Sequence, residues 1–587
     1  MHPRHFRLRF TLNLLRVVAI PNLALWMFFR VTGWAPGISL GTVLYLLTPL
    51  MFKILWSEYS LRRQGIVAAS IGGKLVPEVR GSWIGNIDVL LYRVQSLGGN
   101  YLSQQTVELF EEYKSKIINI RVMWADTFMT SDEGHVKYML TGPGFEHFPK
   151  GLSWQERFES FLGNGIFNRF VSIWCSQHRQ LARPWFSRER ISDFSIFDKH
   201  TTHTLDIMGH FSASRTPFDI QDLVGRFTLD SSSEFLFGSC LNALQGPLPI
   251  AFKAKVGPKG STNDEEVGSF SWAFEDVQVK VAIRLRYGNM WPLLELWNDK
   301  TTTSREIMHH WVTPLIERAV REKGQRRQSE QDSDEEGTFL SHLTDSTDDV
   351  AYIRDQVLNM LLAGRDTTAS LLTFAVYLLA LHPDITDKLR AEITGEFGLD
   401  GIPDPDTMRR LPLLRAVINE TLRLFPPVPI NARVSDSTHQ VFPATKSSPC
   451  LYIPPNTQVT YNTMLIQRNK DTWGEDADEF KPSRWLDPVH IKRVTENPFM
   501  FIPFHAGPRI CLGQNFAYNE ASFFLVRLLQ RFRRFNLASD AQPESTRPPE
   551  WWKERTGRQA IEQVWPWAAF SLYVKGGLWI KVDLAEE

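Results

Sequence analysis

Cys511 is the residue with the most chemistry to offer, and it lies in a short loop between Gly507 and Gly513. An amphipathic stretch comes directly after it and predicts a helix. Unpaired N–H groups and the positive end of the dipole at a helix start favour the thiolate form of a cysteine. Arg509, two residues before the cysteine, is a fixed cation that suits a carboxylate. These residue types predict a thiolate metal ligand beside a group that carries a carboxylate.

The spacing around Cys511 argues against the ordinary alternative, a buried structural cysteine in a glycine turn. The pattern F-x-x-G-x-R-x-C-x-G is complete and resembles the haem-binding loop of the cytochromes P-450, where a cysteine thiolate holds the haem iron. The resemblance implies haem b (iron protoporphyrin IX) as the cofactor, with Cys511 as the axial ligand of its iron. It also implies that the remaining motif residues bind the haem, with Arg509 near a propionate: Phe504, Gly507, Arg509 and Gly513.

A second group of chemical residues interrupts the long apolar stretch 353–380, which predicts a buried helix. Glycine, aspartate and threonine are poor choices inside a helix, and Gly364, Asp366 and Thr367 occur there together. Gly364 is expected to let a ligand approach the backbone. A helix kink with satisfied polar groups is the alternative. The resemblance implies that Asp366 and Thr367 are catalytic and supply protons to bound dioxygen.

Glu420 and Arg423 stand three residues apart in the stretch 411–425, which predicts an amphipathic helix. An exposed pair of this kind is worth little, typically under about 1 kcal/mol. The family resemblance implies instead a buried structural set, completed by Arg484, that holds the core on the haem side. Loss of one partner from a buried set costs about 3–5 kcal/mol.

Residues 425–433 contain three prolines and cannot form a helix. In the resembled family this turn enters the active site, so Val428 and Ile430 are expected to line the substrate site and Arg433 to contact a propionate. The alternative is an exposed proline-rich linker. Near the C-terminus, residues 575–577 read Lys-Gly-Gly between the apolar stretches 570–574 and 578–582, which predicts a hairpin. The resemblance makes Leu572 a substrate-lining residue, with ordinary sheet packing as the alternative.

Arg179 is expected to make a further propionate contact by the same resemblance. The family spacing is W-x-x-x-R, whereas Trp174 lies five residues before Arg179 and Cys175 occupies the expected tryptophan position. A local insertion or a gene-model error explains this offset, and an exposed helix arginine is the alternative role.

The N-terminal residues differ in kind from the rest of the chain. Residues 17–29 form an apolar run interrupted by Pro21 and Asn22, and residues 31–52 contain no charge. The second run is long enough for a bilayer core, which needs about 20 residues. We expect a membrane anchor at residues 1–63 and a catalytic domain at 64–587, facing the cytosol from the endoplasmic reticulum membrane. A pair of buried core helices is the alternative.

Composition narrows the classes of protein. The 587 residues include 65 basic and 65 acidic ones, so no global field favours a nucleic-acid partner. The four cysteines are far apart and form no CxxC pair, which argues against a disulfide framework or a structural zinc site. Strand signals at 117–123 and helical periodicity over most of the later residues predict a mainly α fold with a small β-sheet region.

The resemblance covers the chain from about residue 72 to its end, and phrases at 218–223 and 474–480 look like fungal enzymes that oxidise long alkyl chains. It implies a monooxygenase that inserts one oxygen atom from dioxygen into a lipophilic substrate. No nucleotide-binding motif is evident, so electrons must come from a partner, expected to be NADPH–cytochrome P-450 reductase with cytochrome b5 as a further donor. The alternatives are a haem-thiolate isomerase or dehydratase, a non-catalytic haem-binding protein, and a membrane-anchored interaction protein.

Overall fold

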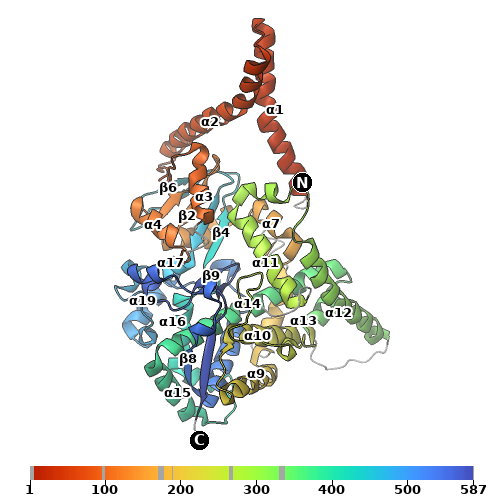
Figure 1. Cartoon of the computed structure of the whole chain (residues 1–587), viewed down its shortest axis with the longest axis vertical. Helices are drawn as coiled ribbons and strands as arrows, with labels where there is room; N and C mark the ends of the chain where they lie inside the picture. Colours follow the sequence, from red (N-terminus) through yellow and green to blue (C-terminus); the bar gives the residue numbers. More distant parts are fainter. Residues whose placement is uncertain are drawn as a thin grey trace.

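The computed structural model describes residues 5–95, 100–168, 178–187, 190–192, 194–262, 269–328 and 338–585. Helices dominate this part of the chain, with small sheets at one side and near the C-terminus (Figure 1). The predicted fold class, mainly α with a small β-sheet region, is confirmed. The α-helices are α1 Phe6–Thr32, α2 Ile38–Ser70, α3 Ile87–Gln95, α4 Gln104–Glu112, α5 Glu133–Leu140, α6 Gly144–His147, α7 Leu152–Leu162, α9 Ser195–Ala213, α10 Ile220–Phe237, α11 Phe270–Arg286, α12 Thr302–Gln328, α13 Phe339–Ser346, α14 Val350–Leu381, α15 Pro383–Phe397, α16 Pro412–Leu424, α17 Thr463–Gln467, α18 Lys470–Trp473, α19 Pro488–Glu496, α20 Gln514–Arg531 and α21 Arg558–Ile561.

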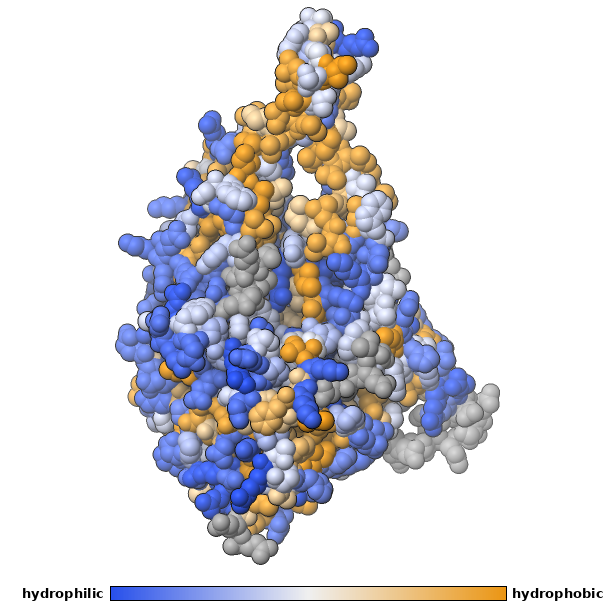
Figure 2. Space-filling model, in the orientation of Figure 1, coloured by the Kyte–Doolittle hydropathy of each residue, from blue (hydrophilic) through white to orange (hydrophobic). Residues whose placement is uncertain are grey.

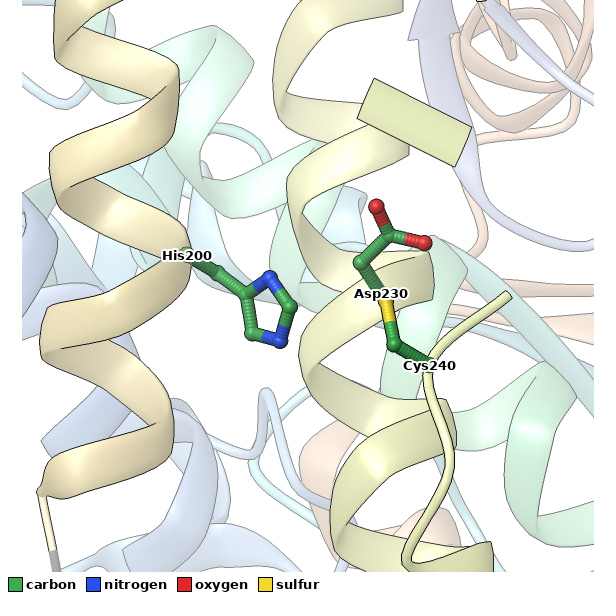
Figure 3. A group of neighbouring side chains, drawn as sticks. All are labelled: His200, Asp230 and Cys240. Carbon is green, nitrogen blue, oxygen red and sulfur yellow. The ribbon is translucent and has the colours of Figure 1, made fainter. Parts of the chain in front are cut away.

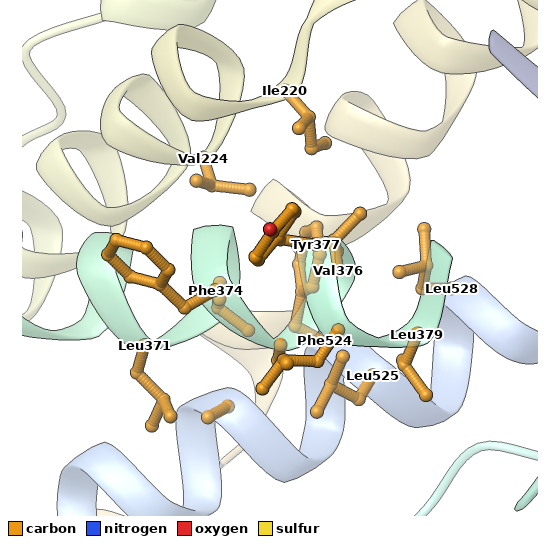
Figure 4. Packing of buried hydrophobic residues seen from close by; sticks show 14 of the residues in the cluster. Ile220, Val224, Leu371, Phe374, Val376, Tyr377, Leu379, Phe524, Leu525 and Leu528 are labelled. Atoms are coloured by element: carbon orange, nitrogen blue, oxygen red, sulfur yellow. The ribbon is translucent and has the colours of Figure 1, made fainter. Parts of the chain in front are cut away.

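Helix α14 is the centre of the core. Asp349 caps its first turn by accepting N–H bonds from Ala351 and Tyr352, and Pro383, which lacks an N–H, begins the next helix. Apolar side chains of α14 meet those of α10 and α20 in the largest buried cluster, including Val224, Phe374 and Phe524 (Figure 4). The helix predicted at 353–380 is therefore present and buried between two neighbours.

The strands form sheets that flank this helical core. One four-stranded sheet has the order β1-β2-β7-β4, with β2 and β7 parallel and the other neighbours antiparallel. A three-stranded antiparallel sheet has the order β3-β11-β8. The strands are β1 Ile117–Asn119, β2 Thr127–Thr130, β3 Phe218–Asp219, β4 Ile430–Val434, β5 Gln440–Phe442, β6 Leu451–Ile453, β7 Gln458–Asn462, β8 Phe532–Leu537, β9 Pro566–Ala568, β10 Leu572–Val574 and β11 Trp579–Leu584.

The hairpin predicted around residues 575–577 is wrong. Gly576 and Gly577 do form a turn with positive φ of 77° and 82°, as their sequence suggests. However, β10 pairs with β9, whereas β11 pairs with β3 and β8, so the turn connects two different sheets. Turn chemistry sets the local backbone, but strands from elsewhere in the chain decide the pairing.

The N-terminal helices α1 and α2 extend beyond the rest of the protein and converge at their far ends, while the start of α1 packs on the body through Phe6 and Trp291 (Figure 1). Both are long and apolar enough to cross a membrane. Of their most apolar stretches, 6% in α1 and none in α2 is buried inside the protein. Their hydrophobic surface contrasts with the mostly polar body (Figure 2). The alternative of two buried core helices is therefore wrong. The residue-63 boundary predicted for the anchor falls inside α2.

Candidate active site

The loop before α20 closes on itself around Cys511. The Cys511 N–H donates to the Phe504 carbonyl oxygen at 3.0 Å, a short 3₁₀ turn covers Gly507–Arg509, and Gly513 is the N-cap of α20. The side chain of Phe504 packs on the ring of Tyr518, whose centroid lies 5.3 Å away. The cysteine therefore sits at the positive end of a helix, as the sequence predicts.

Cys511 is surrounded by protein but remains accessible. Burial raises the pKa of the thiol, and an N–H bond from Gly513 and the charge of Arg179 act against this rise. Burial therefore outweighs the effect of the helix start, and the thiol is less acidic than the sequence predicts. The side chain is nevertheless exposed. Protein atoms thus surround the thiol, while part of the residue remains accessible.

The two glycines of the loop have different physical roles. Gly507 has a φ of +68°, and a Cβ there would lie 1.9 Å from the Leu140 carbonyl oxygen. A side chain at this position is excluded by both backbone conformation and space. At Gly513 the nearest atoms to an added Cβ are a Phe186 ring carbon at 3.6 Å and Cys511 Sγ at 4.0 Å. Gly513 thus leaves space next to the thiol.

Basic groups approach the same loop from other elements. Arg433 on β4 is buried and donates from Nη1 to the Ala432 carbonyl oxygen and to Asn431 Oδ1. Its Nε is buried without a hydrogen-bond partner, and no carboxylate pairs with it within the described ranges. Arg179 donates from Nη2 to the Ile510 carbonyl oxygen at 2.8 Å. An incompletely satisfied buried guanidinium near this loop fits an anionic group of a bound cofactor.

His505 is a neighbour of these cations that sequence reasoning missed. Its Nε2 lies 3.0 Å from Asn431 Nδ2, and its Nδ1 is buried without a hydrogen-bond partner among the described residues. Burial, together with the charges of Arg433 and Lys150, lowers the pKa of His505 to about 3. The residue also has a φ of +61°, which is strained for a side chain of this kind. A neutral histidine there can donate to an anion without adding charge.

The middle of α14 separates the two residues expected to act as a pair. Thr367 is half-buried, and its hydroxyl donates to the Ala363 carbonyl oxygen at 2.6 Å. Asp366 is buried and receives bonds from Arg365 Nη1 at 2.9 Å and from Lys259 Nζ at 3.5 Å. Burial alone would raise the pKa of Asp366, but Lys259 and Arg365 lower it overall. The carboxylate is therefore ionised and held by cations, and no direct bond to Thr367 is present among the described contacts.

Gly364 has a different neighbour from the one expected. A Cβ at this position would lie 2.5 Å from the hydroxyl oxygen of Ser232 on α10. The glycine therefore permits the close approach of α10 to α14, and its expected role toward a ligand stays a prediction.

Glu420 and Arg423 on α16 form a fully buried ion pair. Arg423 Nη2 and Nε donate to the two carboxylate oxygens of Glu420, each at 2.8 Å. Arg484 approaches the same carboxylate with its Nε at 3.4 Å from Oε1 and also pairs with Asp476. These three predicted structural residues are thus brought together in the core, where water cannot screen them.

Comparison with known proteins decides the family. The family model described as Cytochrome P450 matches residues 84–553. The chain belongs to the cytochrome P450 family. Similar proteins are Cytochrome P450 52E2 of Candida apicola, 35% identical over 70% of this chain and 76% of the relative, and Cytochrome P450 52A1 of Candida tropicalis, 34% identical over 74% and 77%. Cytochrome P450 monooxygenase g430 of Fusarium sp is 32% identical over 86% of this chain and 87% of the relative.

The predicted family, its fungal branch and the class of enzyme, a cytochrome P450 monooxygenase, are confirmed by these matches. Membership of the P450 family implies a haem-thiolate cofactor, a redox partner that supplies electrons, and a lipophilic substrate. The exposed Cys511 and the incompletely hydrogen-bonded Arg433 are features of this P450 that fit the cofactor.

The residues expected to line the substrate site of the P450 lie in different environments. Val428 is half-buried and Ile430 is exposed at the start of β4. Leu572 is buried in the main hydrophobic cluster, and its N–H donates to the Pro427 carbonyl oxygen at 2.9 Å. Strand β10 thus holds the proline-rich turn through its backbone. Trp174 and Cys175, on which the spacing question depends, lie outside the described residues.

Three further residues of this P450 could not be found from the sequence pattern. Lys259 is 107 positions from Asp366, and Lys150 approaches His505 from a separate element. Glu520 on α20 is buried, accepts a bond from the Ser231 hydroxyl at 2.7 Å and carries no partner charge among its described contacts. The only sequence signal for Glu520 is an acidic residue on an otherwise apolar helical face.

Proposed function

We propose that this P450 hydroxylates long alkyl chains of alkanes or fatty acids at the endoplasmic reticulum membrane, with its catalytic domain in the cytosol. The names Cytochrome P450 52E2 and 52A1 of its relatives, the sequence phrases typical of fungal alkyl-chain oxidising enzymes, and the two apolar helices support this proposal. Electrons are expected from NADPH–cytochrome P-450 reductase, with cytochrome b5 as a further donor. The observation that carries the proposal is the exposed Cys511 at the start of α20, with the buried and incompletely hydrogen-bonded Arg433 near its loop.

The residues proposed to hold haem b surround this thiol. Cys511 is the ligand of the iron, and Arg433, Arg509 and Arg179 are the partners of the propionates, because guanidinium groups bind carboxylates in a forked geometry. Phe504, Gly507 and Gly513 shape the loop. When bound, the thiolate-ligated haem supplies the activation of dioxygen and the insertion of one oxygen atom into the substrate. Thiolate formation releases a proton, so haem binding must offset the effect of burial on Cys511.

The protein's own contribution to catalysis is proton delivery and positioning. Thr367, half-buried on α14, presents a hydroxyl whose proton is held by the Ala363 carbonyl oxygen and whose lone pairs remain able to accept. Asp366 is the proposed proton carrier behind it. Lys259 and Arg365 keep its carboxylate ionised, so it first accepts a proton from water and then passes it toward Thr367. Glu420, Arg423 and Arg484 hold the core that carries the cysteine loop.

Val428 and Ile430 are proposed to contact the alkyl chain of the substrate. They lie on the turn and first strand residue that come after Pro427, which the buried Leu572 holds through its backbone N–H. Leu572 itself, given its complete burial in the cluster, is proposed to line the site only through the position of this turn.

The test of the proposal compares reduced carbon monoxide difference spectra with turnover. A thiolate-haem absorbance band, together with NADPH consumption in the presence of the reductase and a hydroxylated alkane or fatty acid, is the expected result. A band without NADPH-dependent product would favour a haem-thiolate isomerase, dehydratase or haem-binding protein. The absence of the band would reject Cys511 as ligand. Thr367→Ala is expected to raise peroxide release relative to product, and unchanged coupling would reject Thr367 as the proton donor.

A further inference from the structure

Three residues outside the candidate active site place metal-binding atoms close together. His200 on α9, Asp230 on α10 and Cys240 in the segment after α10 point toward one another (Figure 3). Their ligand atoms lie within 4.8 Å of one another. His200 and Asp230 are buried, and Cys240 is half-buried, so an ion has an entry path from the Cys240 side.

His200 is oriented as metal-bound histidines are. Its Nε2 lies 2.7 Å from Oε2 of Glu234, which is itself held by Lys199 Nζ at 2.8 Å. An ionised carboxylate accepts the Nε2 proton, so the tautomer is fixed and Nδ1 keeps its lone pair. Histidines that bind metals usually donate their second ring N–H to a carboxylate or carbonyl in this way. Within the described residues, no hydrogen bond occupies Nδ1.

Asp230 is held rigidly without using up its acceptor capacity. Its Oδ1 accepts the Ala243 N–H at 2.7 Å, and its Oδ2 accepts the Leu244 N–H at 2.9 Å. Each carboxylate oxygen has two lone-pair sites, so the Cys240 thiol can donate to Asp230 while a site remains for a cation. The same chain segment brings the Asn242 N–H to Cys240 Sγ at 3.2 Å, but burial and Asp230 raise the pKa of the thiol to about 11, so a bound ion must displace its proton. The segment after α10 therefore presents backbone donors behind both anionic ligands.

The distances and charges suit one small divalent ion. The three ligand atoms lie no more than 4.8 Å apart, so a point exists within about 2.8 Å of all of them. If each ligand atom moved about 0.5–0.8 Å toward an ion at this point, its distance would match the usual bond length of zinc to nitrogen, oxygen or sulfur. The Asp230 carboxylate and the Cys240 thiolate balance the two charges of the ion, and Lys199 balances Glu234. A thiolate and an imidazole exclude calcium and magnesium as preferred ions and favour zinc.

We propose that His200, Asp230 and Cys240 bind one zinc ion, with water as the fourth ligand, and that the ion fixes α9 and the segment after α10 against α10. Helix α10 packs on α14, which carries Asp366 and Thr367, so the zinc site supports the core behind the proton-donating residues. The sequence alone predicted no zinc site, because these ligands come from three elements and no CxxC spacing marks them. The site does not depend on the substrate proposed above.

The test is a zinc titration of the haem-loaded, full-length protein after treatment with a chelator. Haem occupies Cys511, so the expected result is one zinc equivalent, with X-ray absorption showing one sulfur ligand at about 2.3 Å and the remaining ligands at about 2.0–2.2 Å. Cys240→Ser is expected to lower the affinity at least 100-fold, and Glu234→Gln 10–100-fold. The matched control is Cys450→Ser, which changes another half-buried free thiol and leaves binding unchanged.

Three results would overturn the zinc proposal. One is no zinc binding by the native protein, and another is zinc bound with equal affinity by Cys240→Ser. Zinc held without a sulfur ligand also overturns it, since this means an adventitious ion only. Each variant is compared at equal carbon monoxide band intensity, which shows that the fold and the haem site are intact, and His200→Gln provides a second variant with the same expected loss.

Discussion

Replacing Glu420 by glutamine removes one charge from the most enclosed ion pair described above. Glu420 and Arg423 are both fully buried. The carboxylate accepts from Arg423 at both oxygens, from the Lys481 N–H at 3.0 Å and from Trp485 Nε1 at 2.9 Å. Glutamine keeps the shape of the side chain but turns an NH₂ group toward these donors. A buried guanidinium is then left without its counter-charge.

The expected loss of stability comes mainly from Arg423, which is left without a carboxylate. Arg484 keeps a second carboxylate, because Asp476 lies 2.8 Å from its Nη1. Among its described contacts, Arg423 keeps the backbone carbonyl oxygens of Gln467, Ala477 and Glu479 and the ring of Trp473, but no carboxylate. Breaking a buried pair of this type costs about 3–5 kcal/mol. Since whole domains are stable by about 5–15 kcal/mol, Glu420→Gln is expected to lower sharply both the free energy of unfolding and the haem-loaded fraction.

The assay is urea unfolding followed by tryptophan fluorescence, with the carbon monoxide band as a second readout. A matched control is the exposed pair Asp406–Arg409, which has the same three-residue spacing and a distance of 3.0 Å. Asp406→Asn is expected to cost less than about 1 kcal/mol, because water screens exposed pairs. If Glu420→Gln costs no more than Asp406→Asn, the reasoning from burial is refuted.

Three further predictions concern the loop, a buried acid and the proton carrier. Gly507→Ala is expected to abolish most haem incorporation, because its Cβ would overlap the Leu140 carbonyl oxygen. Gly513→Ala is expected to keep the fold, because no atom lies nearer than 3.6 Å to the added Cβ. Equal haem content in the two purified variants would contradict this reasoning. Burial raises the pKa of Glu520 from 4.5 to about 8. Between these two pH values the folded state therefore binds more protons than the unfolded state. The free energy of unfolding falls there by up to about 1.4 kcal/mol for each pH unit by which the pH rises. Glu520→Gln should remove this slope in urea unfolding at pH 5–8, and an unchanged slope would show that Glu520 is not its source. Lys259→Met is expected to raise the pKa of Asp366, because the positive charge that lowers this pKa is lost. The low-pH limb of product formation is then expected to move to higher pH. The control Lys253→Met, at an exposed position, is expected to leave that limb in place.

The long helices could be predicted because their signals are local. The helix expected at 353–380 is α14, Val350–Leu381, and the one expected at 411–425 is α16, Pro412–Leu424. Apolar periodicity fixes the face of a helix, and a capping Asp349 and a following Pro383 fix its ends within a few residues. The cysteine loop is equally local, since its closing bond joins Phe504 and Cys511.

Features that depend on contacts between distant residues could not be predicted. The Lys-Gly-Gly turn at 575–577 was assigned to a hairpin because nothing in it identifies β8 and β3 as the partners of β11. Gly364 was assigned to a ligand contact because the approach of Ser232 depends on how α10 packs on α14. The direction of the Cys511 pKa was also mistaken, since burial outweighs the helix-start effects and is a property of the whole fold.

Asp366 and Thr367 show why neighbouring residues in a motif need not act by direct contact. Successive residues of an α-helix differ by about 100° around its axis. Asp366 therefore faces Lys259 in its buried network, while Thr367 lies half-buried and bonded to Ala363. A proton can pass from one side chain to the other only through water, or after Asp366 leaves its cations. The Tyr573 hydroxyl donates to the Lys259 carbonyl oxygen and so holds Lys259 beside Asp366, which favours the route through water.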